Sequence, residues 1–157
     1  MKFSTKEDME ISIDEVFVLL SDFDGFERMI MQRGVDITRM DSAAEIGVGA
    51  KWHAKAEVRG RKRDFDVELV EYDHPNCMQF KAESGGMNGK FTVELVALSR
   101  NRTRMRVELD VKPKTLPARL LMQSARLARN TLNRRYKTRV ANFAEDMEDR
   151  YVRGLRS

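Results

Sequence analysis

The side chains best suited to chemistry in this sequence are two histidines and a single cysteine. His53 alternates with apolar residues, which places it on the polar face of a predicted strand, and His74 precedes Pro75 in a turn sequence. No histidine or cation stands beside Cys77 to hold its sulfur as a thiolate. Neither histidine shares its predicted face with carboxylates at a spacing typical of a metal site or a catalytic triad. We therefore expect no catalytic residue, no metal and no cofactor.

A second candidate for chemistry is a polar stripe near the C-terminus. Ser124, Thr131, Arg135 and Thr138 are separated by seven, four and three residues, which places them on one side of a helix. An arginine that reached from this stripe into an apolar cavity would bind the carboxylate or phosphate of a ligand. The alternative is that Arg135 keeps its guanidinium in water, as long cationic side chains commonly do. The hypothesis is that the acidic end of any ligand lies near Arg135 or Arg119.

The helices and strands that position these residues can be predicted from the spacing of apolar residues, which changes along the chain. Residues 2–11 predict a strand, and residues 12–33 predict a pair of short helices. From 35 to 112, apolar and polar residues alternate in six segments, which is typical of an antiparallel meander with one polar face. After Pro117 the chain lacks glycine and proline for more than thirty residues, so 116–151 predict one long helix. The predicted fold class is α+β, with a curved sheet of seven strands wrapped around the C-terminal helix.

Length and composition limit the classes of protein. The 157 residues have the size of one domain, and we treat 1–157 as a single domain. One cysteine excludes a disulfide within the chain. No apolar run has the length of a signal-peptide core or of a membrane span, and a cytoplasmic location is the expectation.

The charges are distributed unevenly along the chain. Residues 1–27 hold two lysines and eight acids, whereas residues 112–139 hold nine lysines and arginines and no acid. A basic segment of this kind can attract an anionic membrane surface, nucleic acid or an acidic protein. Nucleic acid is disfavoured because Tyr136 is the only aromatic residue in the segment on which a base could stack. The remaining alternatives are that 112–139 meet an anionic membrane surface, or that the two charged ends face each other, within one molecule or in a homodimer.

The order of these elements, together with several motifs, resembles the SRPBCC superfamily. This superfamily includes START lipid-transfer domains, birch-pollen-allergen-like proteins, polyketide cyclases and coenzyme Q-binding proteins. The resemblance rests on an opening strand followed by SIDEVFVLLSDFDGFERM, on Gly47-Val48-Gly49 followed by Trp52, and on LVEYDHPNCMQF. It covers nearly the whole chain and implies a helix-grip fold, in which a curved sheet wraps around a long helix. The superfamily hosts many functions, so the resemblance does not fix an activity.

The resemblance also implies a ligand cavity between the sheet and the long helix. A well-filled core is the alternative, because interiors normally contain few voids and also use small residues. Carried over by position, the residues that would line the cavity are Trp52, Ala54, Phe65, Val67, Met78, Phe80, Phe91, Val93, Met105 and Val107 from the sheet, with Leu121, Ala125, Ala128, Leu132 and Arg135 from the helix.

Three functional hypotheses follow from this interpretation. The first is that the protein binds or transports a small hydrophobic or amphipathic molecule, such as a lipid, a quinone or a polyketide-like compound. The second is an enzyme of the cyclase or dehydratase type that acts on a polyketide-like substrate. The third is a protein-interaction module with a filled core. We expect binding rather than catalysis, because the sequence offers no acid–base pair on the cavity face.

Overall fold

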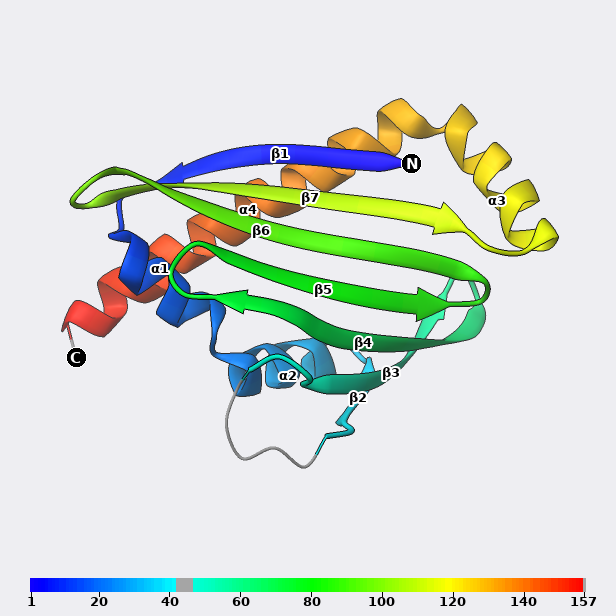
Figure 1. Ribbon diagram of the computed structural model, residues 1–157, viewed down its shortest axis with the longest axis horizontal. Coiled ribbons are helices and arrows are strands. Elements are labelled where there is room, and N and C mark those ends of the chain that lie inside the picture. Colours follow the sequence, from blue (N-terminus) through cyan, green and yellow to red (C-terminus); the bar gives the residue numbers. More distant parts are fainter. Residues whose placement is uncertain (42–46, 157) are drawn as a thin grey trace.

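Seven antiparallel strands form one curved sheet, in the order β1-β7-β6-β5-β4-β3-β2. The computed structural model describes residues 1–41 and 47–156 and confirms the predicted α+β class (Figure 1). The strands from β2 to β7 follow one another as a meander, and β1 adds to the edge beyond β7. The strands are β1 (Lys2–Met9), β2 (Asp36–Arg39), β3 (Lys51–Val58), β4 (Arg61–Asp73), β5 (Cys77–Ser84), β6 (Met87–Ser99) and β7 (Arg102–Pro113).

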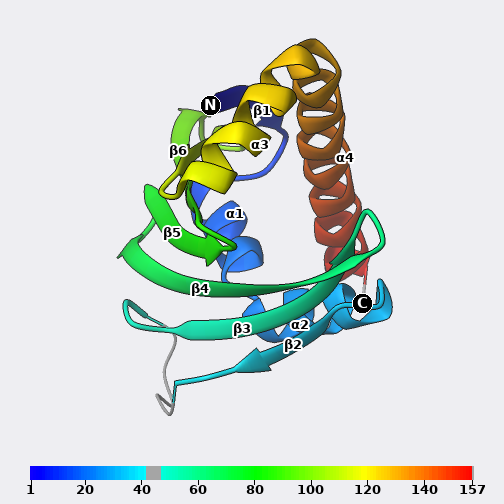
Figure 2. The same cartoon turned by 90° about the vertical axis from the view of Figure 1, so that its right-hand side faces the viewer.

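Four helices lie on one side of this sheet or at its end. Helix α4 runs along the inner face, and the sheet curves around it and α2 (Figure 2). Because the sheet is strongly curved, the inner face forms a trough that helices can only partly cover. The helices are α1 (Ile13–Leu20), α2 (Phe23–Gln32), α3 (Leu116–Leu127) and α4 (Arg129–Arg156). No helix in the described part of the chain is both long enough and apolar enough to cross a membrane.

Side-chain caps fix where three of the helices begin. The Ser12 side chain accepts a hydrogen bond from the backbone N–H of Glu15 at the start of α1. Asp22 caps α2 and Thr115 caps α3 in the same manner. Each cap satisfies one of the N–H groups that a helix start leaves without an intrahelical partner.

The C-terminal helix differs from the prediction, because 116–151 form two helices rather than one. The chain turns at Ala128, where φ is −101° and ψ is 15°, and α3 and α4 meet there at an angle (Figure 2). Helix α3 buries Ala118 and Met122 beside the end of β7, whereas α4 buries Val140 and Ala144 further along the molecule. In a straight helix of 36 residues, about 54 Å long, residues 116–127 would continue along the axis of α4 instead of turning to pack beside the end of β7. Tertiary packing therefore determines a break that no glycine or proline marks.

Two-residue turns set the register of the central strands. Arg59 and Gly60 both have positive φ between β3 and β4, and Gly85 and Gly86 do so between β5 and β6. This is the backbone conformation that tight hairpins with a right-handed twist require. At Gly86, φ is +78° and a Cβ atom would lie 2.5 Å from Oγ1 of Thr115, so only glycine fits against the start of α3.

The tightly packed part of the interior lies around α1. Phe17 is 1% exposed, and its ring lies 5.1 Å from that of Tyr72 and 4.7 Å from that of His74. Thr103 is fully buried and donates a hydrogen bond to the carbonyl oxygen of Ile11, which fixes the link between β1 and α1. Leu69 on β4 is also fully buried. Toward α2 and the middle of α4 the interior is less tightly filled and borders a cavity.

Candidate functional site

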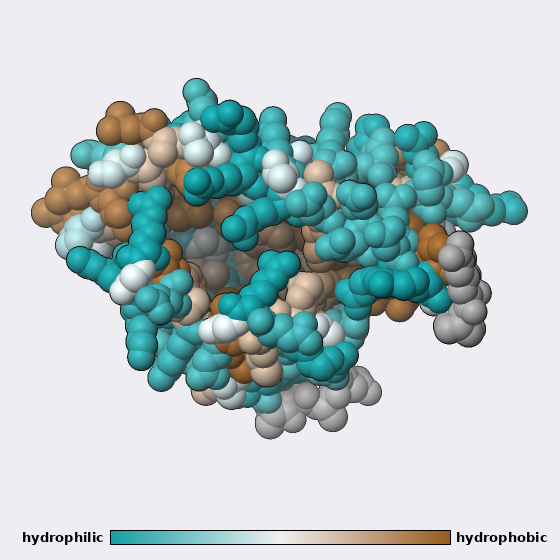
Figure 3. Space-filling model, turned by 180° about the vertical axis from the view of Figure 1, so that it is seen from behind, coloured by the Kyte–Doolittle hydropathy of each residue, from teal (hydrophilic) through white to brown (hydrophobic). Residues whose placement is uncertain are grey.

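Between the inner face of the sheet, α2 and α4 lies an apolar cavity of about 550 Å³. It is open to solvent on the side of α4, where Figure 3 shows a hollow with hydrophobic walls and a hydrophilic rim. Its volume falls within the range of about 300–1,000 Å³ that is usual for small-molecule sites. The residues that line it are Leu20, Phe23, Phe26, Glu27, Ile30, Ile37, Trp52, Val67, Met78, Phe80, Phe91, Val93, Met105, Val107, Leu109, Tyr136, Arg139, Val140 and Phe143.

The sheet forms the floor of the cavity with the side chains on its inner face, because successive residues of a strand point to opposite faces. Inward-facing positions on neighbouring strands stand opposite one another, as in the pairs Trp52 with Val67 and Phe80 with Phe91. The structure brings together eight of the ten sheet residues that were predicted to line a cavity. These are Trp52, Val67, Met78, Phe80, Phe91, Val93, Met105 and Val107.

Trp52 is held in one orientation by three neighbours. Its Nε1–H donates a hydrogen bond of 2.6 Å to Oε1 of Glu27 on α2, and the ring of Phe23 packs edge-on at 5.4 Å. The guanidinium of Arg39 lies 5.5 Å from the indole centroid, a distance typical of a cation–π contact. A paired hydrogen bond to Asp41 orients Arg39 in turn and raises the pKa of its guanidinium. Trp52 is thus a rigid wall of the cavity.

A row of aromatic rings continues from this wall along the floor. The ring centroids of Trp52 and Phe80 are 6.3 Å apart, and those of Phe80 and Phe91 are also 6.3 Å apart. Phe23 on α2 meets Phe80 at 6.1 Å in an edge-on arrangement. Aromatic rows of this kind offer a flat apolar surface that suits hydrocarbon chains or rings.

Helix α4 covers part of the cavity with residues at positions i, i+3, i+4 and i+7. These residues are Tyr136, Arg139, Val140 and Phe143. The hydroxyl of Tyr136 donates a hydrogen bond of 2.7 Å to the carbonyl oxygen of Val107, which ties α4 to β7. Burial, with a smaller contribution from Glu108, raises the pKa of Tyr136 to about 12. The phenol therefore stays protonated at neutral pH and acts as a donor that positions the helix.

Only two of the described lining residues carry a formal charge. Glu27 lies half-buried on α2 with its carboxylate held by Trp52, and Arg139 lies exposed on α4. Arg139 has no ion pair with any carboxylate of residues 1–41 or 47–156. A cation at the rim of an apolar cavity can bind an anionic group of a ligand whose remainder lies inside.

The remaining predicted lining residues lie elsewhere. Ala54 and Phe65 face each other between Trp52 and the Arg59-Gly60 turn, so they fall beyond the end of the cavity. Leu121 and Ala125 lie on α3, which packs at the end of the sheet rather than over its inner face.

The same correction applies to the start of α4. Ala128 forms the turn itself, and neither Leu132 nor Arg135, which lie in the first two turns of α4, lines the cavity. Arg135 shares a shallow groove with Thr131 and Thr138 on the outer side of α4. Three residues of the predicted polar stripe therefore lie together on α4. The arginine at the cavity, however, is Arg139 and not Arg135.

Sequence reasoning also missed the contributions of α2. Phe26 and Ile30 line the cavity, and their spacing of four residues already marks them as one apolar face. A comparable signal existed in α4, where Tyr136, Val140 and Phe143 repeat at intervals of four and three. No local pattern distinguishes a face that packs tightly from one that borders a void, since both require the same apolar residues.

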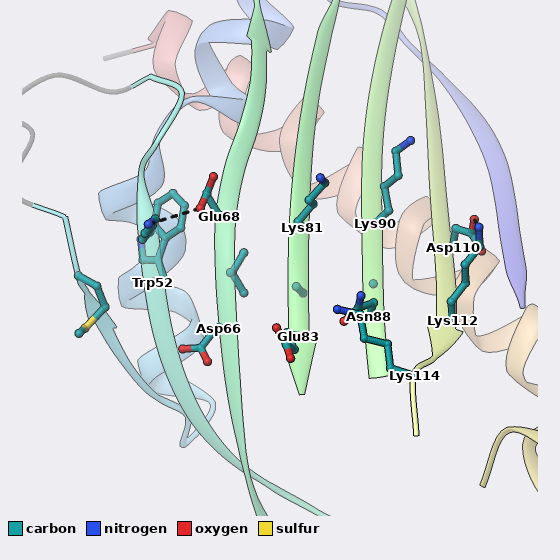
Figure 4. Close-up of a pocket in the computed structure, with 15 residues that line it drawn as sticks. Trp52, Asp66, Glu68, Lys81, Glu83, Asn88, Lys90, Asp110, Lys112 and Lys114 are labelled. Atoms are coloured by element: carbon teal, nitrogen blue, oxygen red, sulfur yellow. Dashed lines mark ion pairs between the residues drawn. The ribbon is translucent and has the colours of Figure 1, made fainter. Parts of the chain in front are cut away.

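A second hollow of about 690 Å³ lies on the outer face of the sheet, turned away from the helices (Figure 4). Nine of its fifteen described lining residues are charged and stand on the face that the sequence predicts as polar; the others are Met40, Trp52, Val67, Ala82, Asn88 and Gly89. Lys51 and Glu68 form an ion pair of 3.6 Å across β3 and β4, and Lys81 and Lys90 stand opposite each other on β5 and β6. These lysines are exposed, so the charged part of the hollow is a solvated surface.

Both histidines lie outside the apolar cavity. His74 sits near Asp14 at 3.8 Å in the turn before β5. On the outer face, Nδ1 of His53 lies 2.7 Å from Asp66 and Nε2 lies 3.3 Å from Asp64. Within the described residues, no three His, Cys, Asp or Glu side chains are grouped so that they could hold a metal ion. The chemistry of the candidate site is therefore that of apolar contacts with a charged rim.

The ion pairs of His53 predict a pH dependence of stability. The hydrogen bond to Asp66, followed by the smaller effect of Asp64, raises the pKa of His53 above its ordinary value of 6.5. A raised folded-state pKa gives a stabilisation that is full below about pH 6.5 and is lost as the pH rises through the folded value. We expect wild type to exceed His53→Gln in stability at about pH 6 and this difference to shrink by about pH 8.5. Urea unfolding of both proteins tests this, and a difference that grows with pH would contradict the assignment.

The sequence matches the family described as polyketide cyclase/dehydrase and lipid transport over residues 1–148. A comparison with curated proteins gave no match. Among solved structures, the Zhui aromatase/cyclase from a Streptomyces species is similar with a TM-score of 0.68 and 12% identity, covering 97% of this chain and 95% of that one. Protein TTHA0849 from Thermus thermophilus has a TM-score of 0.67 and 18% identity, with 98% and 99% covered. Truncated norcoclaurine synthase from Thalictrum flavum has a TM-score of 0.59 and 12% identity, with 73% and 76% covered.

These structural neighbours are too distant in sequence to carry more than the fold. Their fold agrees with the seven-stranded curved sheet and long C-terminal helix described above. The family match extends from β1 into α4 and so includes every element that lines the cavity. The chain therefore belongs to the polyketide cyclase/dehydrase and lipid transport family, within the SRPBCC superfamily.

Proposed function

We propose that the protein binds and carries a small hydrophobic or amphipathic molecule in the cavity between the sheet, α2 and α4. The observation that carries this proposal is the cavity itself, whose wall is almost wholly apolar over a volume of about 550 Å³. Removing an apolar ligand from water into such a wall is favourable by roughly 25 cal/mol for each Å² buried. The family to which the chain belongs supports a ligand of this class.

The two charged lining residues favour a ligand with an acidic end. Arg139 offers a guanidinium at the rim, while the carboxylate of Glu27 is engaged by the indole of Trp52. A carboxylate or phosphate would be repelled on the α2 side and attracted on the α4 side. The ligand we propose therefore places its acyl chain or ring system along the aromatic row and its acidic group beside Arg139.

Native mass spectrometry of freshly purified protein tests the proposal. We expect a fraction of the protein to carry one extra mass that is lost on denaturation and is recovered by organic extraction. Protein stripped of this mass should take up one added fatty acid per chain. A protein that carries nothing, and that binds no member of a panel of fatty acids, quinones and aromatic polyketides, would contradict the proposal.

A second candidate function is a cyclase or dehydratase that acts on a polyketide-like substrate. It is favoured by the family match and by the presence of Glu27 and Arg139 in one apolar cavity. Such an enzyme would use the cavity wall to fold the substrate and the charged groups to orient its carbonyl oxygens. Incubation with a linear poly-β-ketone thioester, followed by product analysis, separates the two candidates, because a carrier returns the substrate unchanged.

A further inference from the structure

Helix α3 exposes large apolar side chains on the side that faces away from the molecule. Leu116, Leu120 and Leu127, which we call the leucine stripe, are 69%, 57% and 93% exposed. Their spacings of four and seven residues place them on one side of the helix. The opposite side is the one that packs against the protein, where Ala118 and Met122 are 3% and 5% exposed. Helix α3 is therefore apolar on two opposite sides, and only one of them has a partner within the described structure.

Cations lie along one side of the leucine stripe and beyond its end on α4. Arg119 and Arg126 lie seven residues apart on α3 and flank the stripe along one side. Beyond the turn at Ala128, a groove of about 300 Å³ on α4 presents three further arginines, Arg134, Arg135 and Arg139. The chain contains no Asp or Glu from residue 111 to residue 144. Of the nine lysines and arginines in this segment, only Lys112 forms an ion pair with another described residue.

The place of α3 in the fold makes this surface accessible. Helix α3 forms one end of the molecule, and α1 and the C-terminus lie at the other end (Figure 1). Figure 3 shows hydrophobic side chains that project among hydrophilic ones at the end formed by α3, on the left of that view. A helix that lies in the interface of an anionic bilayer typically combines exposed leucines with nearby lysines and arginines that have no acidic partner in the protein.

We propose that α3 and the first turns of α4 form a docking surface for an anionic lipid bilayer. The leucine stripe enters the boundary between headgroups and acyl chains. Arg119 and Arg126, together with the arginines of the groove on α4, contact lipid phosphates. A second copy of the chain fits less well, because contact through α3 would bring two acid-free cationic surfaces together. Arg139 belongs both to the groove and to the cavity rim, so docking also brings the cavity close to the membrane.

Vesicle sedimentation of the full chain tests the docking surface. The probes are vesicles of phosphatidylcholine alone and vesicles that also contain phosphatidylglycerol. We expect binding to the anionic vesicles only, and weaker binding as salt is raised. The double variant Leu120→Ser with Leu127→Ser should bind these vesicles at least about tenfold more weakly. The variant Arg119→Glu with Arg126→Glu should lose the preference for anionic lipid.

A matched control uses apolar residues with similar exposure at the far end of the molecule. Val18 and Val96 are 60% and 57% exposed, and a Val18→Ser and Val96→Ser double variant should bind as wild type does. Thermal unfolding and mass by light scattering accompany each protein. The proposal is overturned if wild type ignores anionic vesicles, or if the leucine variant binds them as tightly as wild type. It is also overturned if wild type is a dimer that the leucine variant dissociates, because self-association would then account for the stripe.

Discussion

Replacement of Leu69 by alanine is expected to lower the free energy of unfolding by about 3 kcal/mol. Leu69 is fully buried and does not line the cavity. Its backbone is also fixed, since its N–H donates to Ala50 and its carbonyl oxygen accepts from Gly49, both at 2.9 Å. The truncation would leave a hole that rigid neighbours cannot fill. Urea unfolding followed by circular dichroism measures the loss.

The matched variant is Leu109→Ala, which removes the same atoms from the cavity wall. Leu109 is half-buried and lines the cavity, so its side chain already lacks neighbours on one side. We expect this substitution to cost about 1 kcal/mol, because it enlarges an existing void rather than creating one. Equal losses for the two variants would indicate that the interior around Leu109 is as tightly packed as that around Leu69, and would weaken the case for a cavity.

Replacement of Arg139 by alanine is expected to weaken the binding of a long-chain fatty acid by about tenfold or more. The reason is the loss of a charge-assisted hydrogen bond between the guanidinium and the ligand carboxylate at the rim of the cavity. Arg139 is exposed, so the folded protein should tolerate the change. Calorimetric titration of ligand-free protein measures the affinity. A fatty alcohol of the same chain length should bind both proteins almost equally.

The control for this prediction is Arg135→Ala. Arg135 lies on the same helix and in the same outer groove as Arg139, but it does not line the cavity. Removing it changes the net charge by the same amount and should leave the fatty-acid affinity within about twofold of wild type. If the two variants weaken binding equally, the effect is one of overall charge. If neither does, the acidic end of the ligand does not lie at this rim.

The alternation of strands explains why the sheet could be predicted well from the sequence. In β5, for example, Met78 and Phe80 share one face while Gln79 and Lys81 share the other, and a period of two leaves no ambiguity. Ser12, a residue type that favours the N-cap position, caps α1.

The helices could be predicted less well, because their placement depends on contacts that are distant in sequence. The turn at Ala128 has no local signal, and nothing in the sequence of α4 distinguishes Arg139, which lines the cavity, from Arg135, which does not. The hydrogen bond between Trp52 and Glu27 joins residues 25 positions apart and could not be inferred from either neighbourhood. Whether apolar faces meet or enclose a void depends on the curvature of the whole sheet.

Trp52 allows the most direct test of the cavity, since it is the only tryptophan and lines the wall. Its fluorescence would be recorded while ligand-free protein is titrated with fatty acids that carry a nitroxide, which quenches only at close range, at different positions along the chain. We expect saturable quenching at one ligand per protein that depends on the position of the nitroxide and is reversed by unlabelled fatty acid. Quenching that is linear in ligand concentration and independent of nitroxide position would contradict the account, because the ligand would then collide with the surface rather than occupy the space beside Trp52.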